Sequence, residues 1–284
     1  MNNVIKRKRS IFSIVGTLRH IPLILWACIV IFPILMLVFA SFKTNAQYAH
    51  SLPIAPPESF LNFANYKRTL IEGRILRSLL NSFILMIFGA GLNVLFGSMT
   101  AFCLNRFDFI FKKYFYALFV ASAIIPNALL QVLIYKIMFM LKLTGTFGAP
   151  ILLYAVPSMI QVWIYLQFLE KVPVALDESA MVDGASYLRI FIQIVFPLLA
   201  PATATVLITQ TVFIYSDMYT QFLYCSTPKL QTATTALMTF SGQFATSFNV
   251  MAAGCVAVMI PSLVIFLFLK KYIFAGLTVG SVKG

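Results

Sequence analysis

The sequence has 284 residues, of which 61% are hydrophobic and only 10% are charged. This ratio of apolar to charged residues excludes an ordinary soluble domain and predicts an integral membrane protein. The net charge of +13 does not indicate a nucleic-acid partner, because the basic residues are dispersed at the ends of apolar runs and form no face interleaved with aromatic residues.

Six runs that contain no Asp, Glu, Lys or Arg are each long enough for the roughly 20 residues that cross a bilayer. They are His20–Phe42, Ser78–Asn105, Tyr114–Tyr135, Leu143–Leu169, Ile190–Ser216 and Leu230–Leu269. The first half of the last run is rich in Thr, Ser, Gln and Gly, so we place only about Val250–Leu269 in the membrane and predict an outer loop over Thr232–Asn249. The short alternating segments of a β-barrel are not visible. The predicted fold class is therefore all-α, with six transmembrane helices.

The distribution of basic residues predicts which side of the membrane holds the termini. With six spans, both termini share a side, and 13 of the 21 Lys and Arg residues fall on that side, against 8 in the longer segments opposite. Because cytoplasmic segments are enriched in Lys and Arg, both termini are predicted to be cytoplasmic. The predicted organisation is a cytoplasmic N-terminal segment (1–20), a six-helix transmembrane domain (21–270) and a cytoplasmic C-terminal tail (271–284).

Prolines and polar residues interrupt several of these segments. The first outer segment, Lys43–Arg77, is proline-broken and is predicted to be a loop with a short helix near Asn65–Glu72. The third span has Pro126 at mid-depth, which indicates either the wall of a transport pathway or a simple kink. The fifth span opens at Pro197 or Pro201.

Five polar side chains within the spans are candidates for transient contact with a polar solute near mid-bilayer. They are Asn127, Gln131, Gln161, Thr209 and Gln210. Interhelical hydrogen bonding accounts for them equally well.

The sequence predicts no catalytic, cofactor or metal site, and no enzymatic activity. The G-x-x-x-x-G-K-[ST] loop of nucleotide hydrolases is absent. The only histidines are His20 and His50, which do not have the spacing of a zinc site. No pair of acidic residues lies in mid-span, as an ion-coupled transporter would need. The chain therefore has the shape of a transporter without an energy source of its own.

One charged segment, at about 170–196, stands between two uncharged runs. Its charges are Glu170, Lys171, Asp177, Glu178, Asp183 and Arg189. Each would cost about 2.5–3.5 kcal/mol at the bilayer centre, so the segment must lie outside the hydrocarbon. Acidic residues at Asp177 and Glu178 suit the start of a short helix over Val174–Tyr187, and Gly184 permits a sharp turn.

This segment resembles the EAA loop of type I ABC importer permeases, whose pattern is close to E-A-A-x-x-D-G-A-S with a later I-x-L-P. The matching residues run from Glu178 to Ser186, followed by Ile194 and Pro197, with Ser179 and Phe196 as departures. The ending Gly276–Gly284 is similar to the G-L-T-x-G-x-V-K-G ending of carbohydrate-uptake permeases of the maltose-permease second-subunit kind. Further similar pairs are Asn65-Tyr66, Asn81-Ser82, Arg106-Phe107 and Val172-Pro173. Tyr215-Ser216-Asp217 departs from the family's Trp-Asn before Asp, so the sugar stays open.

The resemblance implies a permease in a bacterial inner or plasma membrane that works with other chains. These are a homologous second permease, two copies of a cytoplasmic ATPase, and an extracellular or periplasmic solute-binding protein. It assigns ATPase coupling to Glu178, Ala180, Asp183, Gly184, Ala185 and Pro197, and a tail contact to Thr278, Gly280 and Lys283. Two other readings are a secondary transporter, which lacks its coupling-ion residues here, and a receptor or anchor, which leaves the loop spacing unexplained.

Overall fold

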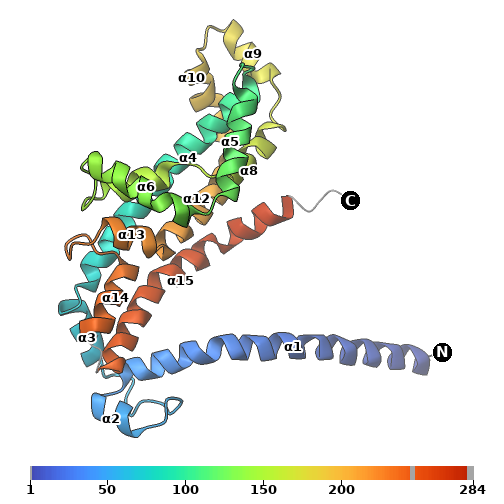
Figure 1. The fold of residues 1–284 in the computed structure, drawn as a ribbon. Coiled ribbons are helices and arrows are strands. Elements are labelled where there is room, and N and C mark those ends of the chain that lie inside the picture. Colours follow the sequence, from blue (N-terminus) through green and yellow to red (C-terminus); the bar gives the residue numbers. More distant parts are fainter. Residues whose placement is uncertain (1, 244–246, 280–284) are drawn as a thin grey trace. The chain divides into compact units, whose positions relative to one another are not determined.

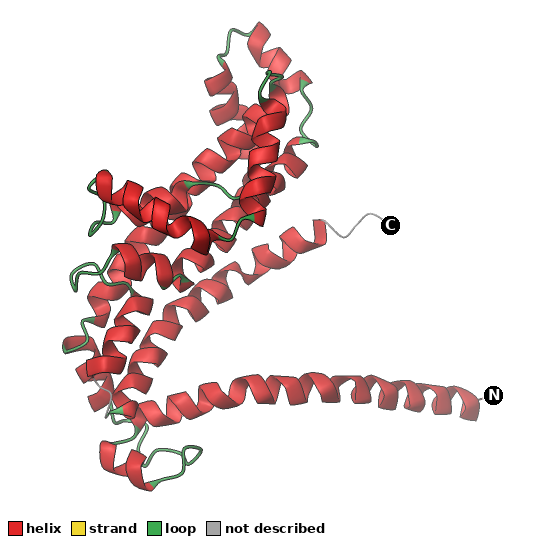
Figure 2. Cartoon of the chain, viewed as in Figure 1, coloured by secondary structure: helices red, strands yellow, loops and turns green. Residues whose placement is uncertain are grey.

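A computed structural model describes residues 2–243 and 247–279, with the side chains of 20–126, 129–238, 240–242 and 247–268. All regular structure in these residues is helical, which confirms the predicted fold class (Figure 2). The chain divides into two compact units: residues 1–73 with 240–257, and residues 74–239 with 258–284.

The first unit contains α1 (Asn2–Phe42), α2 (Asn45–His50), α3 (Ala64–Ile71) and the start of α15 (Phe248–Val279). Helix α3 confirms the short helix expected near Asn65–Glu72. From residue 20 to residue 35, the side chains of α1 are exposed within the chain, although this stretch is strongly apolar. Such a surface suits a helix surrounded by lipid or by another subunit.

A buried asparagine pair holds the end of α1. Asn65 donates through Nδ2 to the carbonyl oxygens of Ser41 and Lys43, at 2.8 Å each. Asn249 donates through Nδ2 to the Lys43 carbonyl and to Asn65 Oδ1, at 3.0 Å each. The last carbonyls of a helix have no partner inside the helix, so these two side chains supply the missing donors.

The second unit is built on α4 (Ile75–Arg106), which packs against α7 (Gly148–Ala155), α8 (Met159–Leu169) and α12 (Ala200–Ser216) (Figure 1). A Cβ atom at Gly89 would lie 3.0 Å from Tyr154 Cβ and from Ile214 Cδ1. The absence of a side chain at Gly89 therefore lets the backbones of α4 and α7 approach closely, as small residues do between membrane helices.

Proline-linked breaks divide three of the predicted spans into helix pairs. Helices α5 (Lys112–Ile124) and α6 (Asn127–Met140) bend by 111°, and α7 and α8 bend by 43°. The segment Tyr187–Leu198, made of α10 (Tyr187–Ile190), η1 (Phe191–Val195) and α11 (Phe196–Leu198), meets α12 at 79°. Together with α1, α4 and α15, these pairs make six candidate membrane spans by length and composition.

At the break between α7 and α8, backbone polar groups are hydrogen-bonded to side chains of α4 and of α8 itself. Asn93 is fully buried and donates through Nδ2 to the carbonyls of Tyr154, at 2.9 Å, and Val156, at 3.2 Å. Ser158 begins α8 with a capping box, in which Gln161 accepts from the Ser158 N–H at 2.7 Å. The carbonyls of Tyr154 and Val156 and the N–H of Ser158, on either side of Pro157, are therefore paired inside the protein, as a membrane interior requires.

Two segments are more regular than the sequence predicted. The expected outer loop Thr232–Asn249 contains α14 (Ala233–Gln243), which follows α13 (Tyr219–Tyr224). The Ala233 N–H donates to Ser82 Oγ at 2.9 Å, so a partner from α4 satisfies the start of this polar helix. Helix α15 continues to Val279, so the first part of the expected C-terminal tail has helical backbone.

Replacing Asn65 with Asp should destabilise the protein. Asp removes both Nδ2 bonds and sets a carboxylate oxygen against two carbonyl oxygens, so we expect a loss of about 3 kcal/mol in the free energy of unfolding. The midpoint of thermal unfolding of the detergent-purified protein measures it. Asn45→Asp is the control, because Asn45 is exposed at the start of α2. Equal midpoints for the two variants would contradict the role assigned to Asn65.

Candidate coupling site

The charged segment at 170–196 forms a helix, a tight turn and a second helix beside the C-terminal end of α4 (Figure 1). The first helix, α9, spans Ala175–Val182, and the second begins with α10. Asp177 and Glu178 both lie in the first turn of α9, where the helix dipole favours negative charge. We call residues 170–196 the coupling segment.

Gly184 gives α9 its ending. Its φ of +80° lies in the left-handed region, which disfavours residues with a Cβ. The Gly184 N–H donates to the Met181 carbonyl at 3.0 Å, and the Ala185 N–H donates to the Ala180 carbonyl at 2.9 Å. These two bonds make a Schellman motif, in which Ala180 and Ala185 bring their small side chains against the core. An added Cβ at Gly184 would meet nothing within 4 Å, so the glycine is needed for its backbone angle alone.

Ser186 begins the second helix, and Pro197 follows a widened turn of that helix. The Ser186 side chain caps α10 by accepting from the Arg189 N–H at 3.4 Å. Directly before Pro197, the Phe196 N–H donates to the Phe191 carbonyl, which widens the helix into the π-type segment η1. The spacing of the loop motif is therefore the spacing of a helix, a turn and a second helix.

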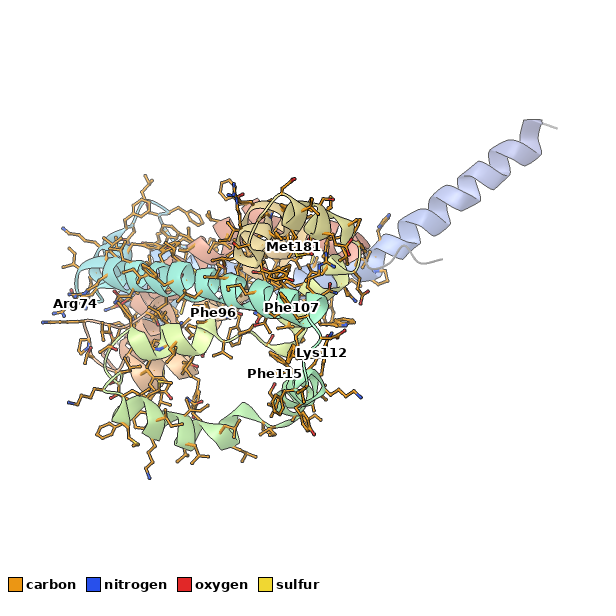
Figure 3. The ribbon with its side chains drawn as sticks, turned by 90° about the horizontal axis from the view of Figure 1, so that it is seen from above. Arg74, Phe96, Phe107, Lys112, Phe115 and Met181 are labelled. Carbon is orange, nitrogen blue, oxygen red and sulfur yellow. The ribbon has the colours of Figure 1, made fainter. Side chains whose placement is uncertain are left out.

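One side of α9 is exposed and mixes apolar with acidic groups. Val174, Glu178, Met181 and Val182 follow the i, i+4, i+7, i+8 spacing of one helix face, and we call them the coupling face. Val182 is 88% exposed. Figure 3 shows Met181 beside the end of α4 that carries Phe107. Asp183 adds a second exposed carboxylate next to this face.

The other side of α9 is anchored by a buried ion pair that sequence reasoning missed. Arg106 Nε lies 2.6 Å from Asp177 Oδ2, and the side chains are 8% and 6% exposed. Arg106 also donates to the Val172 carbonyl and to Asn105 Oδ1, at 2.9 Å each. The sequence carries two separate signals for this pair. One is a lone Arg at the end of an uncharged span, and the other is a predicted helix with two adjacent acidic residues later in the chain.

Aromatic contacts join the same end of α4 to the second helix. The rings of Phe107 and Tyr187 meet edge to face with centroids 4.8 Å apart, and those of Phe102 and Phe191 lie 5.4 Å apart. The edge-to-face pair is favourable beyond the apolar area it buries.

A second ion pair, between Lys112 and Asp108, is exposed to solvent. Lys112 donates to Asp108 Oδ1 at 2.8 Å, and the Asp108 side chain is 99% exposed. This hydrogen bond lowers the pKa of the Asp108 carboxyl. Exposed pairs of this kind contribute little to stability.

Of the predicted solute-contacting residues, the structure brings Gln161 and Gln210 into direct contact. Gln161 donates to Gln210 Oε1 at 2.6 Å, and Gln210 donates to the Tyr154 carbonyl at 3.1 Å, with both side chains buried. Thr209 is exposed and donates to the Thr205 carbonyl, while Gln131 is half-buried and donates to the Tyr224 hydroxyl at 3.3 Å. The Asn127 side chain lies outside the described residues.

The predicted tail contact is also outside what the structure describes. Thr278 belongs to the backbone of α15, but its side chain, with Gly280 and Lys283, falls beyond the described residues.

The sequence resembles proteins of known family along almost its whole length. Residues 93–279 match the family described as the binding-protein-dependent transport system inner membrane component. The melibiose/raffinose/stachyose import permease protein MelC of Bacillus subtilis is 34% identical over 91% of this chain and 93% of its own. The galactooligosaccharides transport system permease protein GanQ of the same organism is 30% identical over 93% and 94%.

The fold also matches a solved structure. A chain from the crystal structure of a bacterial ABC transporter that imports the acidic polysaccharide alginate aligns with a TM-score of 0.79. The match covers 94% of this chain and 98% of the other, at 19% identity. The chain belongs to the family of binding-protein-dependent transport system inner membrane components.

Proposed function

We propose that this chain is a transmembrane permease subunit of an ATP-binding-cassette importer that moves a sugar into the cytoplasm by alternating access. The observation that carries the proposal is the coupling segment, whose outer face is free while its inner face is fixed to α4. The names of MelC and GanQ support a sugar or oligosaccharide as the solute. ATP is hydrolysed on separate subunits, and this segment transmits their movement to the membrane-spanning helices.

The coupling face docks on a cytoplasmic ATPase subunit. Met181 and Val182 would lose exposed apolar surface in a groove of the partner, and Glu178 and Asp183 would accept hydrogen bonds from its basic or backbone donors. Ala180, Gly184, Ala185 and Pro197 act indirectly, because they fix the turn and the direction of the second helix.

The assembly has three further kinds of chain. A homologous permease completes the pathway, two copies of the ATPase bind the cytoplasmic side, and a solute-binding protein delivers the sugar outside. The family description, which names binding-protein-dependent transport, supports the last of these.

The sugar passes between this chain and the partner permease. Thr209 and Gln131 keep part of their surface accessible and suit transient contact with hydroxyl groups. Gln161 and Gln210 bond to each other and would contact sugar only if that pair opened.

Glu178→Lys should lower sugar uptake by at least about tenfold, because a hydrogen bond to an ionised group contributes about 1.5–3 kcal/mol. Uptake into vesicles that contain the assembled complex measures it. Glu170→Lys makes the same charge change at an exposed residue outside the coupling face. A normal rate for Glu178→Lys, or an equal loss in both variants, would contradict docking through Glu178.

Position 184 should respond to backbone preference rather than to size. Gly184→Asn should be tolerated better than Gly184→Ala, since Asn enters the left-handed region more readily and Ala pays about 1–2 kcal/mol there. Gly184→Asp adds a charge and should abolish uptake. Gly91→Ala is the matched control, since Gly91 is helical and also has open space at its Cβ position. Equal uptake by Gly184→Ala and Gly91→Ala would contradict the role of Gly184 in the turn.

The C-terminal tail contacts the two ATPase subunits differently in their open and closed states. Only such a difference can bias the cycle, because equal binding to both states shifts nothing. Deleting Thr278–Gly284 should therefore reduce the stimulation of ATP hydrolysis by the loaded solute-binding protein while assembly is retained. ATPase activity and uptake of the purified complex test this, and unaltered values of both would make the tail a passive end.

A further inference from the structure

We infer that the dipeptide Arg106-Phe107 is a clamp that fixes both helices of the coupling segment to α4, and that the Arg106–Asp177 ion pair is its main positioning contact. The inference rests on the proposed function, which it deepens by naming the residues through which movement of α9 enters the packed helices.

Arg106 holds α9 and the chain that leads into it. Its guanidinium reaches Asp177 on α9 and the Val172 carbonyl just before α9. Asp177 is buried while its neighbour Glu178 is exposed, because consecutive helical residues point about 100° apart. A push on the coupling face at Glu178 is therefore delivered across the width of one helix to Arg106.

Phe107 holds the second helix in the same way. Its ring packs edge to face on Tyr187, and Phe102 one turn earlier packs on Phe191. Figure 3 shows Phe107 at one end of α4 and Arg74 at the other end of the same helix. Both arms of the coupling segment thus meet the last turns of one helix, and that helix packs along α7, α8 and α12.

Stability alone does not account for the ion pair. A buried pair often gives no more stability than well-packed apolar residues of similar size. Here the pair is incompletely satisfied, since Asp177 Oδ1 has no hydrogen-bond partner among the described residues and Arg106 Nε is not in line for a hydrogen bond. What the planar guanidinium does supply is direction, because it contacts two points at a fixed angle.

The test uses the complete transporter in proteoliposomes, with its solute-binding protein and raffinose as the probe sugar. The double variant Arg106→Met with Asp177→Leu removes both charges together and fills the site with apolar groups. We expect assembly and basal ATP hydrolysis like those of the wild type. Stimulation by the loaded binding protein, and uptake per ATP hydrolysed, should fall about tenfold, which is typical of lost coupling between sites.

Lys112→Met is the matched control, because it removes the exposed pair with Asp108 at the start of α5 and should change neither readout. Full stimulation and an unchanged ratio of uptake to ATP hydrolysed in the double variant would overturn the clamp.

If the double variant does not assemble, Arg106→Lys tests the clamp instead, since Lys keeps the charge and loses the two-point contact. An unchanged ratio in Arg106→Lys would overturn the clamp, and a lowered ratio would support it. Failure of the wild-type complex to use ATP for uptake of any sugar that its binding protein binds would instead count against the proposed function.

Discussion

The requirement that every backbone polar group in a membrane find a partner within the protein governs this structure. Three of its six candidate spans are broken, and each break frees carbonyls or N–H groups that lipid cannot satisfy. At the break between α7 and α8, Asn93 and Gln210 supply donors from α4 and α12, and Ser158 with Gln161 supplies a capping box. Polar side chains that look like solute contacts are thereby engaged in holding bent helices together.

The coupling segment follows a different rule, because it lies outside the apolar spans and can leave groups exposed. Its small residues are used for shape: Gly184 provides the turn, and Ala180 and Ala185 allow close packing. Its neighbouring acidic residues differ in burial and therefore in role. Asp177 is buried against Arg106, whereas Glu178 is open to a partner. The short motif therefore contains residues that determine the local fold and residues that form an exposed surface for a partner.

Much of this could be predicted from sequence, and the parts that could not share a physical cause. Apolar runs, prolines and a glycine between two helices are local signals, so the spans, α3 and the sharp turn at Gly184 were predicted. The pairing of Gln161 with Gln210, and of Arg106 with Asp177, depends on residues far apart in the chain that only tertiary packing brings together. Helix α14 was missed because its Thr and Ser residues favour a loop until Ser82 satisfies its first N–H.

The open space at Gly184 has a stereochemical consequence. The backbone there adopts the φ natural to a residue of opposite handedness, and the Cβ of an L residue would meet no neighbour, so the φ alone disfavours an L side chain. A D-alanine introduced at this position by chemical synthesis would thus favour the turn and reduce the freedom of the unfolded chain. What the turn selects is chirality, and among the genetically encoded residues glycine is the one that has none.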